Sequence, residues 1–258
     1  MHHAYIDKFA YQDSPVHRLD PRMKFIAAII FTAFVISLPR HAVALPVCCI
    51  TGPFVVLVIG KTPLRFVLKH IAITSPLIAV LAASCIFYDR AVVDIVFGPF
   101  SWQSTAGALR AASIVIKFTV TMMTLTALVS TTRFSDLLAA IQKLGIPQVL
   151  IMQIAMLYRY IFLIIDNAAH ILQARSCRKL RNLGFKTELK VAAAMVGTLL
   201  VTSFNQAHAT SLAMQARSFD GKWRTLSHMK LKFADAAFAA AFIIFIAVMW
   251  FLAAPRTN

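Results

Sequence analysis

Five stretches of this 258-residue chain are apolar over 14 to 22 residues and carry almost no charge. They occupy residues 25–38, 42–59, 71–87, 111–129 and 233–254. A helix rises about 1.5 Å per residue, so it needs roughly 20 apolar residues to cross a hydrocarbon layer about 30 Å thick. We therefore predict an all-α integral membrane protein with about five transmembrane helices, of which the first is short for a full crossing.

The composition excludes an ordinary soluble domain. Hydrophobic residues make up 59% of the chain and charged residues only 14%, whereas soluble domains are roughly 25% charged. The formal net charge of +16 is typical of some nucleic-acid-binding proteins, but such proteins do not need membrane-length apolar stretches, so we predict no nucleic-acid partner. The four cysteines form no C-x-x-C pair and indicate neither a disulfide framework nor a zinc site.

The distribution of basic residues predicts the orientation in the membrane. Of the 26 lysines and arginines, 14 lie in residues 133–232, and others precede the first apolar stretch or separate the second from the third. Basic loops stay on the cytoplasmic side of a membrane. We predict a cytoplasmic N-terminal segment (1–24), transmembrane helices 1–4 (25–132), a cytoplasmic block (133–232), and the last transmembrane helix with the C-terminus (233–258).

The cytoplasmic block is typical of helix over nearly its whole length. We predict a short helix at 135–144 and two long helices at 147–180 and 188–219. Gly184 ends the first long helix, and Thr187 is the expected cap of the second. Small residues spaced four apart in the second long helix permit a close helix crossing, although alanine is also simply a good helix former.

One string, Gln-Ala-Arg-Ser, occurs twice, at 173–176 and at 215–218, near the ends of the two long helices. An arginine in the last helical turn meets the negative end of the helix dipole, which is one explanation and is worth about 0.3–1 kcal/mol. The alternative is a binding site, because a planar guanidinium with five donors suits carboxylates and carbonyls of a partner protein. The candidate binding residues are Ala174, Arg175, Ser176, Ala216, Arg217 and Ser218.

The paired Ala-Arg-Ser strings resemble those of the transmembrane (T) component of energy-coupling factor (ECF) transporters. That family carries Ala-Arg-Gly or a close variant, and both copies here have serine in place of glycine. The N-terminal residues 6–11 (Ile-Asp-Lys-Phe-Ala-Tyr) and the segment from Ser14 to Arg22 resemble the cobalt and nickel subgroup, the CbiQ type. The resemblance covers nearly the whole chain.

The resemblance implies a coupling subunit of an ECF-type ABC importer of the bacterial inner membrane. The two long helices would cross as an X, with Arg175 docking on one CbiO-type ATPase subunit and Arg217 on another. A CbiM-type substrate-binding membrane subunit, with a small CbiN-type subunit as an optional partner, would import a divalent metal, cobalt before nickel. The chain itself would hold no cofactor, no metal and no catalytic residue, and the partner ATPase subunits would bind ATP.

Other functions remain open at this point. They include the T subunit of a nickel or vitamin ECF transporter, a stand-alone membrane carrier and a membrane enzyme. A carrier usually shows duplicated spans or polar residues along a pathway, and the repeat here lies outside the predicted spans. An enzyme needs clustered catalytic groups, but the block contains only four acids, which are widely spread: Asp136, Asp166, Glu188 and Asp220.

Three further features have structural interpretations. Gly60-Lys61-Thr62 matches the end of a phosphate-binding loop, but Val55 stands where that motif needs glycine, so we predict a loop that leaves a membrane helix. His2 and His3 supply too few ligands for a closed metal site. Lys117 and Asp235 lie in or beside apolar stretches, and we predict structural roles for both rather than an ion relay.

Overall fold

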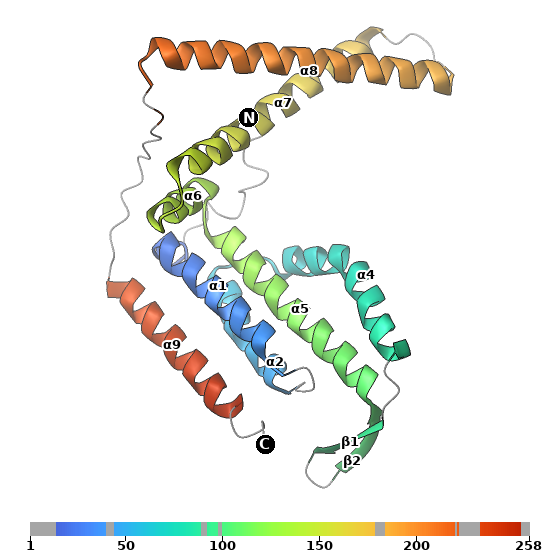
Figure 1. Cartoon of the computed structure of the whole chain (residues 1–258), viewed down its shortest axis with the longest axis vertical. Helices are drawn as coiled ribbons and strands as arrows, with labels where there is room; N and C mark the ends of the chain where they lie inside the picture. The colour runs from blue at the N-terminus through green and yellow to red at the C-terminus, as the bar shows by residue number, and fades with distance from the viewer. Residues whose placement is uncertain are drawn as a thin grey trace. The chain divides into compact units, whose positions relative to one another are not determined.

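The structure, a computed structural model, describes residues 14–39, 44–88, 92–97, 100–178, 184–219, 221 and 233–253. These residues are almost entirely helical, which confirms the predicted fold class, and they include one two-stranded hairpin (Figure 1). The chain divides into two compact units. The larger contains residues 4–140 and 227–258, and the smaller contains residues 141–226 with residues 1–3.

The larger unit is built mainly from helices, most of which contact one central helix, α5 (Ala106–Thr131). Its elements are α1 (Pro21–Ser37), α2 (Ala44–Cys49), α3 (Thr51–Ile59), α4 (Leu64–Tyr88), β1 (Val92–Phe97), β2 (Phe100–Thr105), α5 (Ala106–Thr131) and α9 (Phe233–Ala253). The helix α6 (Phe134–Lys143) follows α5 and continues into the smaller unit. The antiparallel hairpin pairs Val92 with Thr105 and falls where the sequence predicted only a loop.

The first helix begins four residues before the apolar stretch from which we predicted it. Asp20 is its N-cap and accepts a hydrogen bond from the backbone N–H of Arg22 at 2.9 Å. Pro21 follows at the first helical position, where a missing N–H costs nothing. The acidic cap and the proline that follows it therefore determine where α1 begins. The helix is 17 residues long.

The second apolar stretch forms two short helices rather than the single helix that we predicted. Pro46 lies in α2 and Pro53 in α3, and the break falls between them at Ile50. Pro53 is in the first turn of α3, where its lack of an N–H is tolerated. The hydroxyl of Thr51 donates to the carbonyl of Cys48 at 2.7 Å and satisfies one of the groups that the break exposes.

The proline in α4 is accommodated without help from another helix. Pro76 lies inside α4 and cannot donate to the carbonyl of Ala72 four residues earlier. The hydroxyl of Ser75 donates to that carbonyl at 2.9 Å. A side chain of the same helix therefore satisfies the carbonyl that Pro76 leaves without its helical donor.

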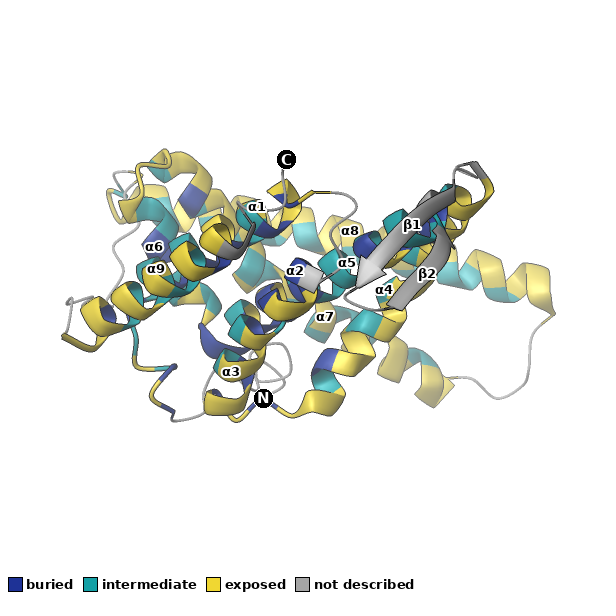
Figure 2. Cartoon of the chain, turned by 90° about the horizontal axis from the view of Figure 1, so that it is seen from below, coloured by how far each residue is buried: buried dark blue, intermediate teal, exposed yellow. Residues whose placement is uncertain are grey.

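One hydrophobic core cluster of the larger unit lies where α1, α2, α5 and α9 meet (Figure 2). Its buried residues are Phe31, Val35, Leu38, Leu45, Cys49, Val120 and Met249. Phe31 contacts Phe242 and Phe245 of α9 at ring-centroid distances of 6.5 and 6.2 Å. Lys117 of α5 donates to the carbonyl of Leu38 at 2.6 Å, just past the end of α1, which agrees with the predicted structural role.

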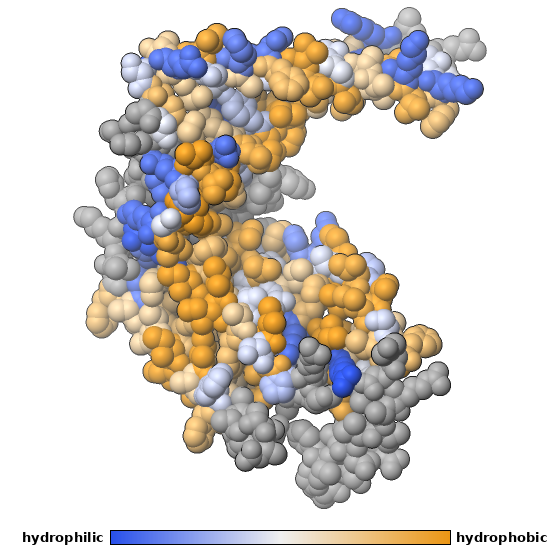
Figure 3. Space-filling view, in the orientation of Figure 1, coloured by the Kyte–Doolittle hydropathy of each residue, from blue (hydrophilic) through white to orange (hydrophobic). Residues whose placement is uncertain are grey.

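Five described helices are long and apolar enough to cross a membrane, and the protein is a multi-pass membrane protein. They are Leu64–Phe87, Gly107–Thr131, Gln148–Arg178, Phe185–Ala216 and Phe233–Phe251. Only three of these coincide with predicted spans, and the other two are the long helices of the predicted cytoplasmic block. Figure 3 shows hydrophobic side chains over much of the visible surface. Length and apolarity therefore do not distinguish the three predicted spans from the two long helices that we predicted to be cytoplasmic.

The smaller unit consists mainly of α7 (Gln148–Arg178) and α8 (Phe185–Ala216), which cross each other (Figure 1). The amide of Asn167 donates to the side-chain oxygen of Gln206 at 3.3 Å between them. The N-cap of α8 is Gly184 and not Thr187, whose N–H instead bonds the Gly184 carbonyl at 2.9 Å inside the first turn. No residue of α8 is buried, and its large apolar side chains, such as Leu200 and Phe204, are exposed.

Candidate functional site

The two copies of Gln-Ala-Arg-Ser have different backbone conformations. The copy at 173–176 lies wholly inside α7, which ends at Arg178. The hydroxyl of Ser176 there donates to the carbonyl of Gln173 at 2.7 Å. The copy at 215–218 runs past the end of α8, whose last helical residue is Ala216. The identical strings are therefore not structurally equivalent.

The end of α8 is a hydrogen-bonded turn with a left-handed residue. The N–H of Ser218 donates to the carbonyl of Gln215 at 2.9 Å, and the N–H of Phe219 donates to the carbonyl of Met214 at 3.1 Å. Ser218 has a φ of 52°. Glycine is the usual residue at this position of a helix end, because a side chain is strained in the left-handed conformation.

We expect glycine to have opposite effects in the two copies. The substitution Ser218→Gly relieves the left-handed strain and should stabilise the end of α8 by up to about 1 kcal/mol. The matched control Ser176→Gly places glycine inside a helix and should cost about 0.5 kcal/mol. Thermal unfolding of the full chain in detergent, followed by circular dichroism at 222 nm, measures both shifts. Shifts of the same sign in both variants would contradict this assignment of the two backbone conformations.

Arg175 is held by an acid of the neighbouring helix. A terminal nitrogen of its guanidinium (Nη2) forms an ion pair with the carboxylate oxygen Oε2 of Glu188, in the first turn of α8. The two side chains are 26% and 27% exposed. Arg175 also lines a cavity of about 220 Å³ between α7 and α8, whose other lining residues are apolar: Ala168, Ile171, Leu172, Ala192, Met195, Val196 and Leu199.

Arg217 has a different environment. It is the exposed C-cap of α8, and no acidic side chain pairs with it in the part of the chain that the structure describes. Glu188, the partner of Arg175, precedes Arg217 by 29 residues of nearly continuous helix, which corresponds to about 40 Å along the axis. The structure thus does not bring the two predicted arginines together, and they lie at two separate helix ends.

The sequence singled out both arginines, but it did not reveal Glu188 as the neighbour of Arg175. Glu188 was counted only among acids too scattered for catalysis. One sequence signal was available: Glu188 follows Gly184 by four residues and Arg175 by 13. This position places an acid at the start of the second long helix, a short connection after the end of the first. The two Ala-Arg-Ser strings remain predictions as partner-binding residues.

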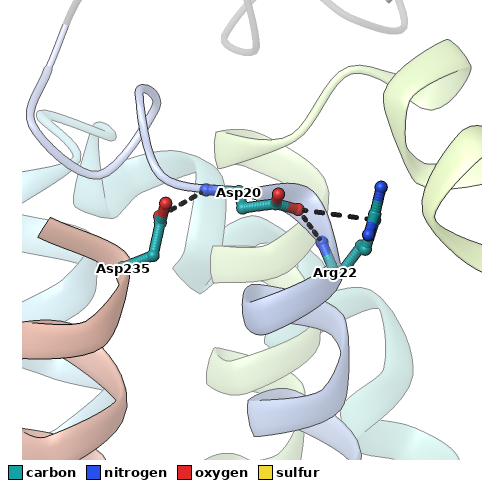
Figure 4. Close-up of polar contacts among 3 residues, drawn as sticks. All are labelled: Asp20, Arg22 and Asp235. Carbon is teal, nitrogen blue, oxygen red and sulfur yellow. Dashed lines mark hydrogen bonds and ion pairs between the residues drawn. The ribbon is translucent and has the colours of Figure 1, made fainter. Parts of the chain in front are cut away.

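A second polar cluster ties three helices of the larger unit together. The backbone N–H of Asp20 donates to Oδ1 of Asp235 at 2.7 Å (Figure 4), and the two residues are only 5% and 2% exposed. The buried ammonium of Lys24 donates to the carbonyl of Thr131, the last residue of α5, at 3.0 Å. Asp235 thus completes the capping of α1 from the start of α9, which agrees with the structural role predicted for it.

The remaining sequence features do not form a site in the described residues. Lys61 has a φ of 52°, and Thr62 N–H bonds the carbonyl of Leu57 at 3.2 Å, so Gly60-Lys61-Thr62 forms the end of α3, as predicted. Among the described residues, no three His, Cys, Asp or Glu side chains gather in a group that could hold a metal ion. His2, His3 and the segment 6–11 lie outside the described residues.

Comparison with known proteins places the chain in a family. The model of the cobalt transport protein family CbiQ matches residues 12–229. The chain therefore belongs to the CbiQ family. Because it is also similar over nearly its whole length to transmembrane proteins of ECF transporters, it is the T subunit of an ECF-type importer.

The relatives include both ECF and cobalt transport proteins. The ECF transporter transmembrane protein EcfT of Bacillus selenitireducens is 28% identical over 261 residues, which are 95% of each chain. The cobalt transport protein CbiQ of Rhodobacter capsulatus is 27% identical over 172 residues, 65% of this chain and 66% of that one. A putative ABC transporter ATP-binding protein of Bifidobacterium longum is 28% identical over 253 residues, which are 92% of this chain but only 32% of that much longer relative.

Proposed function

We propose that this chain transmits the motion of two ATPase subunits to a substrate-binding membrane subunit. The observation that supports this proposal most is that two crossed helices each carry an arginine at one end. These two ends are about 40 Å apart along α8. Among the described residues, Ile151 is the one buried residue of α7, and α8 has none. Helices are stiff because their backbone hydrogen bonds are internal, so a displacement at one end moves the whole helix. Two separate ends suit two separate motor subunits.

The ATPase subunits supply the nucleotide chemistry in this proposal. Similarity to part of a longer putative ABC transporter ATP-binding protein supports a link to such subunits. We assign Ala174, Arg175 and Ser176 to one CbiO-type ATPase subunit and Ala216, Arg217 and Ser218 to the other. The chain itself is non-catalytic and holds neither ATP nor a metal as a cofactor.

We place residues 133–232 in the cytoplasm, with the N-terminus on the same side of the bacterial inner membrane. The second half of α7 is rich in polar and charged residues, among them Asp166, Asn167, His170, Gln173, Arg175 and Arg178. Charged side chains are costly at membrane depth, so this half is poorly suited to hydrocarbon although the whole helix is long enough to span it. The boundaries 1–24, 25–132, 133–232 and 233–258 remain our proposed domains.

The proposed cargo is a divalent metal, cobalt before nickel. Membership in the CbiQ family and similarity to a cobalt transport protein support this choice. Similarity to EcfT proteins supports an ECF transporter of another substrate as the alternative, and we propose nickel or a vitamin for it. We propose a CbiM-type subunit as the site of substrate binding, with a CbiN-type subunit as a further partner.

Reconstitution into liposomes tests the proposed function. The chain alone should show no ATP hydrolysis and no cobalt uptake. Addition of the two cognate ATPase subunits and the substrate-binding subunit should produce cobalt uptake that requires ATP, and omission of the chain from that mixture should abolish it. Uptake by the chain alone would support a stand-alone carrier, and ATP-driven uptake without the chain would contradict a coupling role.

A further inference from the structure

The two arginines proposed to dock on ATPase subunits are not equally available. Arg175 forms an ion pair with Glu188, whereas Arg217 is exposed and has no acidic partner within the described ranges. Glu188 lies in the first turn of α8, four residues after the N-cap Gly184. The ion pair therefore joins the end of α7 to the beginning of α8.

The ion pair between Arg175 and Glu188 lies where a partner protein can reach and break it. Each side chain is about a quarter exposed, so water screens the attraction and the pair adds little net stability. A carboxylate or carbonyl of another protein attracts a guanidinium by the same charge-assisted hydrogen bonds that Glu188 makes. Glu188 also cancels the positive charge of Arg175, which weakens the long-range attraction of this helix end for an acidic groove.

We propose that Glu188 is an intramolecular competitor that occupies Arg175 until the groove of an ATPase subunit displaces it. This inference rests on the proposed function, because it requires docking at Arg175. Its consequence is that the two helix ends dock with unequal affinity. Arg217 has no acidic partner among the residues that the structure describes, whereas Arg175 must first exchange one carboxylate partner for another.

The test measures the affinity of the full chain, in detergent, for its purified ATPase subunits. The measurement uses an Arg217→Ala background, in which docking at the other helix end is weakened. In this background, Glu188→Gln should raise the affinity for the ATPase subunits about 1.5- to 5-fold. This factor corresponds to the free energy that a partly exposed ion pair contributes. The gain should shrink at high ionic strength, because salt screens exposed charges.

Asp166→Asn provides a matched control. It also removes one negative charge from this pair of helices. Asp166, however, lies nine residues before Arg175, which is about 13 Å along the axis and on the opposite side of α7. The affinity of this variant should equal that of the Arg217→Ala parent. An equal gain from Asp166→Asn and Glu188→Gln would show an effect of net charge alone and would overturn the proposal.

A second background separates competition from a purely structural role. In an Arg175→Ala chain, Glu188→Gln should leave the affinity unchanged. If Glu188 acted only by stabilising the N-terminus of α8, where a negative charge is favourable, its loss would weaken binding in both backgrounds. A weaker or unchanged affinity in the Arg217→Ala background would overturn the competitor while leaving docking at Arg175 intact. If Arg175→Ala itself had no effect on affinity, the docking assignment would fail and the competitor with it.

Discussion

The double variant Arg175→Ala, Arg217→Ala should lose at least nine-tenths of its ATP-dependent cobalt uptake in the reconstituted complex. Hydrogen bonds to charged groups contribute about 1.5–3 kcal/mol each, so loss of both contacts should weaken ATPase association by a hundredfold or more. Each single variant should retain part of the uptake, because one helix end still docks. Arg→Lys should rescue poorly at either position, because an ammonium lacks the planar fork of donors.

Arg178→Ala is the control that separates docking from helix stabilisation. Arg175 and Arg178 both lie in the last turn of α7, so each can interact with the helix dipole. Only Arg175 belongs to the repeated string. If the string serves docking, Arg178→Ala should retain uptake close to that of the unchanged chain, and co-purification of the ATPase subunits should follow the same order. Full uptake in the double variant, or equal losses in Arg175→Ala and Arg178→Ala, would refute the assignment.

The helices were largely predictable from the sequence because their determinants are local. The apolar stretches 71–87, 111–129 and 233–254 coincide with α4, α5 and α9, since an apolar run in a membrane protein has few alternatives to helix. The long helices of the smaller unit were also predicted to within three residues at each end. The hairpin β1–β2 was missed because its short strands, with Asp94 and Gln103 facing each other, carry no strong alternating pattern.

The contacts between helices were not predictable from one sequence. The repeated string identified Arg175 and Arg217, but only the crossing of α7 and α8 brings Glu188 to the first of them. The backbone difference between Ser176 and Ser218 was also hidden, because the four letters are identical in both copies. The bond between Asp20 and Asp235 joins residues 215 positions apart, and no local pattern records such a pairing.

That bond should make Asp235 one of the most sensitive positions of the larger unit. In Asp235→Ala, the buried N–H of Asp20 loses its acceptor, and an unsatisfied buried donor costs about 1–3 kcal/mol. The capping of α1 and the attachment of α9 are weakened together, because one hydrogen bond serves both. We therefore expect the thermal midpoint of the full chain in detergent to fall by several degrees, as measured by the fraction that stays monodisperse after heating.

Asp235→Asn is the matched control, because its side-chain oxygen can still accept from Asp20 N–H. Its midpoint should lie closer to that of the unchanged chain than to that of Asp235→Ala. Hydrogen exchange offers a direct readout, since the Asp20 amide should exchange faster in the alanine variant and remain protected in the asparagine variant. If both variants melted alike, the carboxylate charge would matter more than the bond, and Lys24, buried in the same cluster, would be the next position to substitute.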